Sequence, residues 1–230
     1  MPAVLWATGP VLLDFDGPMT SLLAGGRNRL AADRLRLVLH GQGVALPAEI
    51  ATTNDPLEIL RQAGRSRNVA AVNQVEAELR RCEIEAAHDS SATAGAADFL
   101  AACHDTQRPV VIVSNNGAEA IRAYLDLHQL RGHVHQVIGR PYARPELMKP
   151  HPAIVLSALA GLGTEPDRCV LVGDSITDIQ VARATGVRSI GYVKAPERPA
   201  GLEAAGADAT TESMRYLATL TRAVGPVPRS

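Results

Sequence analysis

The sequence predicts an α/β protein in which a parallel sheet is interrupted by an inserted all-helical domain. Short apolar runs that do not alternate with polar residues are typical of strands buried on both faces. Helical periods separate these runs, and this alternation is the pattern of βαβ units. The strand pattern stops between residues 20 and 92, which predicts the helical insertion. Strands are expected at residues 11–13, 110–113, 170–172 and 189–193, with a weaker candidate at 134–138.

The insertion is expected to contain three helices. Apolar residues recur at spacings of three and four over residues 69–86, which predicts one face of a long helix. Asp55 followed by Pro56 is typical of an N-cap and the first residue of a helix over residues 56–63. An earlier helix is expected over residues 28–40, ended by the glycines that follow.

Composition and charge narrow the class of protein. Hydrophobic residues make up 46% of the chain and charged residues 20%, which excludes a disordered protein or a coiled coil. The 23 basic and 24 acidic residues leave a net charge of -1, so neither nucleic acid nor a membrane is expected as a partner. The first 26 residues contain no Lys or Arg, so no secretory signal is expected. These observations predict a cytoplasmic protein.

The first strand candidate ends in two carboxylates. Asp14 and Asp16 lie on the same side of an extended backbone, and Gly17 permits a sharp turn after them. Carboxylates this close suit a nucleophile with an acid/base partner, or the binding of a hard cation. A simple turn rich in Asp and Gly at the end of a strand explains the motif equally well.

The second strand candidate ends in Ser114 and Asn115, directly before a helix. A hydroxyl and free backbone N–H groups at a helix N-terminus form a ready site for phosphate. Ordinary N-capping accounts for the same residues.

Lys149 is followed by Pro150 and Pro152, which fix the backbone before the next helical period. It is one of only two lysines, the other being Lys194. A compact ammonium suits a phosphate group beside carboxylates. The alternative is an ordinary surface lysine.

The strand candidate at residues 170–172 is followed by Asp174 and, four residues later, by Asp178. Both can face one crevice at the edge of the sheet. Mg²⁺ prefers one or two protein carboxylates together with substrate phosphate, and Asp14, Asp16 and Asp174 could supply them. Helix capping is the local alternative.

Together, these motifs resemble those of the haloacid dehalogenase superfamily of phosphohydrolases. The matching residues are Asp14 to Gly17, Ser114, Lys149 and Gly173 to Asp178, and the resemblance covers nearly the whole chain. It is closest to the branch of phosphoglycolate phosphatase and β-phosphoglucomutase. That branch implies a Rossmann-like core of residues 1–19 and 93–230 with a helical cap of residues 20–92. One departure is Pro18, where the family usually has Thr or Val.

The resemblance implies a Mg²⁺-dependent hydrolase of small phosphorylated metabolites. Asp14 would attack phosphorus to form an aspartyl phosphate, and Asp16 would protonate the leaving oxygen and later activate water. Ser114, Asn115 and Lys149 would bind the phosphoryl group. Asp14, the Asp16 carbonyl and Asp174 would bind the metal, with Asp178 orienting the lysine and the metal shell.

Two alternatives to hydrolysis stay open. A phosphomutase must hold a second phosphate, for which the cap loop of residues 52–55 offers no basic residue. A phosphoryl-accepting regulatory module also combines aspartates, a lysine and Mg²⁺, but such modules lack a helical insertion. The dehalogenase branch itself lacks the second aspartate that Asp16 provides.

The cap is expected to select the substrate, because the core motifs address only the phosphoryl group and the metal. The loop of residues 52–55 resembles the family's specificity loop, so Thr53 and Asn54 are the expected contacts. Whether Arg27, Arg29 or His151 also meets substrate stays open. The oligomeric state is expected to be a monomer or a weak homodimer.

Overall fold

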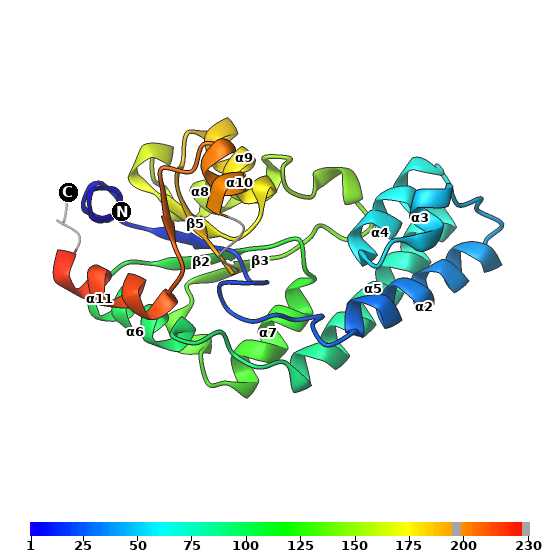
Figure 1. Cartoon of the computed structure of the whole chain (residues 1–230), viewed down its shortest axis with the longest axis horizontal. Coiled ribbons are helices and arrows are strands. Elements are labelled where there is room, and N and C mark those ends of the chain that lie inside the picture. Colours follow the sequence, from blue (N-terminus) through cyan, green and yellow to red (C-terminus); the bar gives the residue numbers. More distant parts are fainter. Residues whose placement is uncertain (195–198, 227–230) are drawn as a thin grey trace.

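The structure, a computed structural model, describes residues 1–194 and 199–226. The described residues form a six-stranded parallel sheet with the order β3-β2-β1-β4-β5-β6 (Figure 1). This arrangement confirms the predicted fold class. The strands are β1 (Val11–Leu13), β2 (Val110–Val113), β3 (Gln136–Ile138), β4 (Val170–Gly173), β5 (Arg188–Tyr192) and β6 (Ala209–Thr211).

Helices cover both faces of the sheet. Successive residues of a strand point to opposite faces, so Leu12 joins one apolar cluster and Leu13 the other. Burial on both faces is why the central strands are continuous apolar runs. The face of Leu13 is covered by α1 (Pro2–Ala7), α6 (Ala96–Asp105), α7 (Ala118–Leu127) and α11 (Met214–Val224), and the face of Leu12 by α8 (Ala153–Leu162) and α9 (Ile176–Thr185). The short helix α10 (Pro199–Ala204) packs against α9 and β5.

The chain between β1 and α6, which is described throughout, forms helices that extend beyond the sheet at one end of the molecule (Figure 1). They enclose a separate apolar cluster, to which α2 contributes Leu35, α4 contributes Ile59 and α5 contributes Leu79. Met148 from the sheet-containing part joins this cluster. The helices are α2 (Arg27–Gly41), α3 (Ala48–Thr52), α4 (Pro56–Arg65) and α5 (Val69–Asp89).

The three helices expected in this region are confirmed, with ends within a few residues of those predicted. Asp55 caps α4 as predicted, because its Oδ1 accepts a hydrogen bond from the Leu57 N–H at 2.9 Å. Within residues 1–194 and 199–226, no helix combines the length and apolar character that crossing a membrane requires.

Short elements are where the structure departs from the sequence prediction. Helix α3 has five residues and β6 has three, so neither is long enough to show a period. The residues of β6 are Ala-Thr-Thr rather than an apolar run. Helix α1 was not expected either, and β3 is shorter than the predicted 134–138. Single turns of 3-10 helix occur at Arg131–His133, Pro145–Leu147 and Pro166–Arg168.

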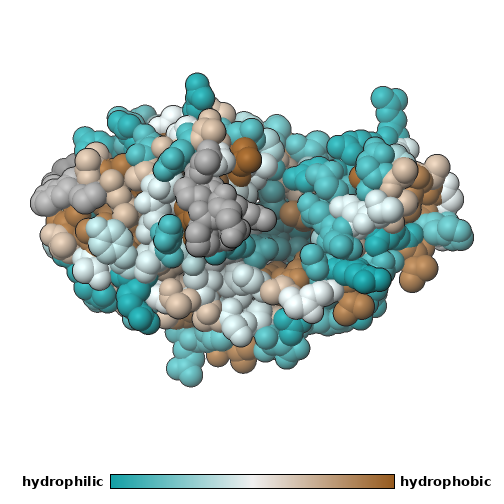
Figure 2. All heavy atoms as spheres, viewed as in Figure 1, coloured by the Kyte–Doolittle hydropathy of each residue, from teal (hydrophilic) through white to brown (hydrophobic). Residues whose placement is uncertain are grey.

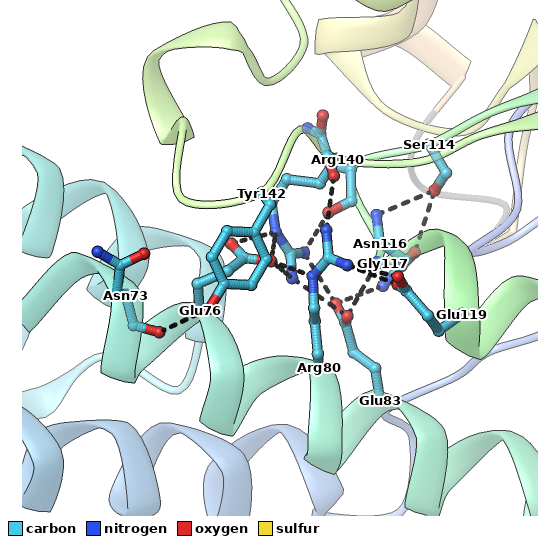
Figure 3. A network of polar contacts seen from close by, with 11 residues as sticks. Asn73, Glu76, Arg80, Glu83, Ser114, Asn116, Gly117, Glu119, Arg140 and Tyr142 are labelled. Carbon is cyan, nitrogen blue, oxygen red and sulfur yellow. Dashed lines mark hydrogen bonds and ion pairs between the residues drawn. The ribbon is translucent and has the colours of Figure 1, made fainter.

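A buried arginine joins the helical insertion to the sheet (Figure 3). Arg140 lies in the loop after β3, and its side chain has no exposed surface. Its guanidinium pairs with Glu76 and Glu83 of α5, each at 3.0 Å. Arg80, also on α5, donates a hydrogen bond to the Arg140 carbonyl at 3.1 Å and pairs with Glu119 of α7 at 2.7 Å. The insertion is therefore connected to the sheet by buried charge as well as by apolar packing.

Replacing Arg140 should destabilise the whole fold, because the buried Glu83 would lose its cation and the buried Glu76 would keep only Arg80. Arg140→Met is expected to lower the free energy of unfolding by about 3–5 kcal/mol. Arg188→Met is a matched control, since Arg188 is 53% exposed and pairs with Asp208 at the surface, and it should cost no more than about 1 kcal/mol. Urea denaturation followed by circular dichroism measures both. Equal losses would show that burial of the Arg140 pair is not what stabilises the fold.

Candidate active site

The carboxyl ends of neighbouring strands bring the predicted motifs together. Asp14 follows β1, while Asp174 follows β4 and Ser114 follows β2, the two strands that pair with β1. Asp178 lies in the first turn of α9. One carboxylate oxygen from each of Asp14, Asp174 and Asp178 lies within 4.8 Å of the other two. Residues far apart in the sequence thus meet at one edge of the sheet.

Lys149 places a positive charge among these carboxylates. Its Nζ lies 2.9 Å from Asp14 Oδ1 and 2.5 Å from Asp178 Oδ1. The same nitrogen donates a hydrogen bond to the Val113 carbonyl at 3.0 Å. Burial acts to lower the pKa of Lys149, but the two carboxylates outweigh it and raise that pKa above its ordinary value. The side chain is therefore held as an ammonium.

Asp14 occupies an environment that disfavours its own charge. Burial raises its pKa, Asp178 and Asp174 raise it further, and Lys149 opposes them, so that the pKa is about 8. A divalent cation beside the cluster would offset this repulsion. Because every donor is a carboxylate oxygen, the kind of ligand that Mg²⁺ and Ca²⁺ prefer, the three aspartates fit a hard divalent cation.

Asp16 lies beside this cluster in a tight loop. Its Oδ1 accepts a hydrogen bond from the Leu22 N–H at 3.1 Å. Gly17 follows with a φ of 112°, and a Cβ there would lie 2.5 Å from both Asp174 Cγ and Lys194 Cε. Only glycine therefore allows the loop to pack against the carboxylate cluster.

Lys194 lies at this site, although it was not among the predicted site residues. It follows β5, and its Nζ lies 2.6 Å from Asp174 Oδ2. Burial acts to lower the pKa of Lys194, but Asp174 and Asp16 raise it above the ordinary value. Its position just after a strand, as one of two lysines in the chain, was the signal that could have identified it.

The loop after β2 is closed by hydrogen bonds of its own side chains. Ser114 Oγ donates to Asn116 Oδ1 at 3.1 Å and accepts from the Asn116 N–H at 3.3 Å. Asn115 is fixed to the lysine segment, since its Oδ1 accepts from the Lys149 N–H at 2.8 Å and its Nδ2 donates to the Lys149 carbonyl at 3.2 Å. Asn116 was not predicted as a site residue, although it directly follows two that were.

A cavity of about 460 Å³ lies between this edge of the sheet and the helical insertion. Figure 2 shows the molecular surface hollowed between the larger, sheet-containing part and the helical part. The polar residues that line this cavity come from both parts. The sheet-containing part contributes Asp16, Asn116 and Lys194, and the helical insertion contributes Ser21, Asn28, Asn54, Asp55 and Glu83.

The predicted pair in the cap loop has two different environments. Asn54 lines the cavity. The Thr53 hydroxyl instead accepts a hydrogen bond from the Asp55 N–H at 3.1 Å, and the Thr53 carbonyl accepts one from Arg36 at 2.6 Å. The structure therefore gives Thr53 a role in shaping the loop.

The three residues left open by the sequence have other contacts, and of these His151 shares a cavity with Lys149. Arg27 is 3.7 Å from Asp89, and Arg29 is 4.0 Å from Asp33 on the same helix. His151 lines a second cavity, of about 690 Å³, and its Nδ1 accepts a hydrogen bond from the Ala153 N–H at 3.2 Å. The structure does not bring them to the carboxylate cluster.

A parallel α/β sheet with aspartates, a serine and a buried lysine at its carboxyl edge is the architecture of a haloacid dehalogenase-like hydrolase. The model of that family matches residues 51–192, and the chain belongs to the family.

Known proteins resemble the chain in sequence and in fold. A phosphoglycolate phosphatase of Salmonella paratyphi A is 33% identical over 95 residues, which are 41% of this chain and 37% of the relative. A HAD family hydrolase of Deinococcus radiodurans R1, with bound phosphate and sodium, is 25% identical with a TM-score of 0.62 and covers 96% of this chain and 99% of its own. A hydrolase of Pseudomonas syringae has a TM-score of 0.68 at 20% identity, covering 95% and 100% of the two chains.

The raised pKa of Asp14 predicts how the metal-free protein responds to pH. A folded-state pKa near 8, against 3.8 for the ordinary group, means that the folded protein binds this proton more tightly, so stability is lost as the pH rises from about 4 to 8. Asp14→Asn removes this loss. Between pH 5 and pH 8 the free energy of unfolding of the variant should rise relative to wild type by about 1–4 kcal/mol.

Urea denaturation in the presence of a chelator checks this at both pH values. Saturating Mg²⁺ should shrink the difference, because a bound cation favours the ionised carboxylate. Parallel pH profiles for the two proteins without metal would contradict the prediction.

Proposed function

We propose that the protein is a Mg²⁺-dependent hydrolase of small phosphomonoesters that acts through an aspartyl-phosphate intermediate. The observation that carries this proposal is the buried contact of Lys149 with both Asp14 and Asp178 at the carboxyl edge of the sheet. A phosphate dianion approaches a carboxylate nucleophile only where cations and hydrogen-bond donors neutralise it. The phosphate held by the Deinococcus radiodurans hydrolase and the activity named for the Salmonella relative support the same chemistry.

Asp14 is the proposed nucleophile. One of its carboxylate oxygens attacks phosphorus while the ester oxygen leaves, so one P–O bond forms and one breaks. The other oxygen and the Asp16 carbonyl, with Asp174, would hold Mg²⁺, which supplies positive charge to the phosphoryl oxygens. The Asp14 Oδ1 already accepts a hydrogen bond from the Phe15 N–H at 2.8 Å and forms an ion pair with Lys149 Nζ at 2.9 Å, and these contacts fix the orientation of its carboxylate.

Asp16 is the proposed acid and base. Its side chain lines the cavity, where the leaving group would lie. In the first step its carboxyl group gives a proton to the departing alkoxide, and in the second it takes one from the water that hydrolyses the aspartyl phosphate. The hydrogen bond from the Leu22 N–H holds the side chain without consuming its second oxygen.

Ser114, Asn115 and Lys149 are proposed to hold the phosphoryl group. The Ser114 hydroxyl is a donor that can turn towards the phosphoryl group, and the ammonium of Lys149 lies beside the nucleophile. Asp178 orients this lysine at 2.5 Å. Its other oxygen accepts hydrogen bonds from Ser175 at the start of α9, so both ends of the carboxylate are fixed.

The helical insertion, residues 20–92, is proposed to be a cap that reads the leaving group. The proposed catalytic residues of the sheet-containing part address only the phosphoryl group and its metal. Asn28, Asn54 and Asp55 of the insertion line the cavity opposite Asp16, where the leaving group would lie. A cavity of about 460 Å³ has room for a small metabolite.

Removing the Asp14 carboxylate should abolish turnover. Asp14→Asn is expected to lower kcat for p-nitrophenyl phosphate at least about 1,000-fold with Mg²⁺ present, because the amide is a poor nucleophile. Asp33→Asn makes the same chemical change on an exposed residue of α2 and should keep wild-type activity. Chelation should inactivate the wild type, and added Mg²⁺ should restore it.

Wild-type rates in Asp14→Asn or in the chelated enzyme would refute the mechanism. Stable phosphorylation of Asp14 without turnover would instead identify a phosphoryl-accepting module.

Asn54, which lines the cavity, should affect substrate choice. Asn54→Ala is expected to lower kcat/KM for the best substrate in a panel of phosphorylated metabolites by about tenfold, the effect of one lost hydrogen bond, while p-nitrophenyl phosphate changes less than about threefold. Thr52→Ala is the neighbouring control, since the Thr52 hydroxyl is exposed and bonds to the Ala48 and Glu49 carbonyls of its own helix, and it should change neither substrate. Equal effects of Asn54→Ala on both substrates would place selection elsewhere in the cavity.

A further inference from the structure

Glu83 is a fully buried carboxylate that connects helix α5 to the loop after β2 (Figure 3). Its Oε1 accepts a hydrogen bond from Asn116 Nδ2 at 3.2 Å, and its Oε2 accepts one from the Gly117 N–H at 2.9 Å. The Arg140 guanidinium donates to the same two oxygens at 3.0 and 3.2 Å. Both oxygens are therefore shared between an arginine and the loop.

These contacts continue to Ser114. Asn116, held through its amide by Glu83, contacts Ser114 Oγ with its own side-chain oxygen at 3.1 Å and with its backbone N–H at 3.3 Å. The position of Ser114 Oγ is thus set by a residue that α5 holds in place. The hydroxyl proton can still rotate towards an anion without moving the oxygen.

Arg140 reaches the lysine segment by a second route. Its Nη1 donates a hydrogen bond to the Asn115 carbonyl at 2.5 Å. The Asn115 side chain pairs with both the N–H and the carbonyl of Lys149. The Arg140 guanidinium therefore contacts both Glu83, which holds the Ser114 loop, and the Asn115 carbonyl, whose residue holds the Lys149 segment.

Charge balance requires the two residues to act together. Glu83 lines the cavity, and an unpaired carboxylate there would repel a phosphate group. Arg140 neutralises it, with Glu76 on the far side of the guanidinium. Burial acts to lower the pKa of Arg140, but the two glutamates outweigh it and raise that pKa, so the cation persists.

We propose that Glu83 and Arg140 are positioning residues, which hold the loop of residues 114–117 in the conformation that binds the phosphoryl group. This inference rests on the proposed function. It means that the anion site is completed by a helix of the insertion, because the loop's amide and N–H groups take their orientation from α5.

Glu76 provides a matched control. It is as buried as Glu83, lies two turns earlier on α5 and pairs with the same guanidinium at 3.0 Å. Its other hydrogen bond comes from Arg80, not from the loop. Glu76→Gln and Glu83→Gln remove equivalent buried charges, and only the second disturbs the contacts with Asn116 and Gly117.

Binding of inorganic phosphate in the presence of Mg²⁺, measured by calorimetry, tests the proposal together with KM and kcat for p-nitrophenyl phosphate. Glu83→Gln should weaken phosphate binding and raise KM by about tenfold, whereas Glu76→Gln should change both by less than about threefold at a similar loss of thermal stability. Equal changes in the two variants, or none in either, would show that the network is only structural and would overturn the inference.

Two further outcomes keep the tests separate. A wild-type protein that neither binds phosphate nor hydrolyses the ester would refute the proposed function, and with it this inference. Should Glu83→Gln fail to fold, Glu83→Asp replaces it. Aspartate keeps the buried charge beside Arg140, but its side chain is one methylene too short to reach both Asn116 Nδ2 and the Gly117 N–H. The same tenfold weakening supports the proposal, and wild-type binding overturns it.

Discussion

Mutual repulsion of carboxylates at the carboxyl edge of the sheet is the constraint on which the site depends. Asp14, Asp174 and Asp178 come within 4.8 Å of one another in a largely buried setting, where like charges interact strongly. Lys149 offsets the repulsion between Asp14 and Asp178, and Lys194 does so at Asp174. Burial and the neighbouring carboxylates together raise the pKa of Asp14, and a divalent cation beside it would stabilise the ionised carboxylate.

A second pair of buried carboxylates, farther from the sheet edge, also shares a cation. Glu76 and Glu83 would repel each other, and Arg140 lies between them. Buried ion pairs of this kind seldom add stability beyond what apolar residues would provide, so their value lies in the geometry that they impose. Here the geometry ties α5 to the loop after β2, which makes the helical insertion and the sheet one continuous structure around the cavity.

The central strands and the long helices could be predicted because burial on two faces or on one face leaves a period in the sequence. Convergence of Asp14, Ser114, Lys149 and Asp174 followed from the parallel sheet, whose carboxyl ends share one edge. The Arg140 network could not be predicted this way, since Glu76 and Glu83 resemble the solvated positions of an ordinary helix. Only their spacing of seven, among the apolar residues Val75, Leu79 and Cys82, hinted that this face is also buried.

Lys149 and Lys194 are the only lysines in the chain, and every other basic residue is an arginine. All side-chain amines of the protein therefore lie at one edge of the sheet. Lys149 is 2% exposed and Lys194 is 33% exposed, so an amine-acylating reagent meets a single accessible side chain. Acylation there would take the ammonium away from Asp174 and leave the arginine-based surface unchanged. Lys194 is therefore a chemical handle beside the carboxylate cluster, at a position where acylation changes the charge next to Asp174.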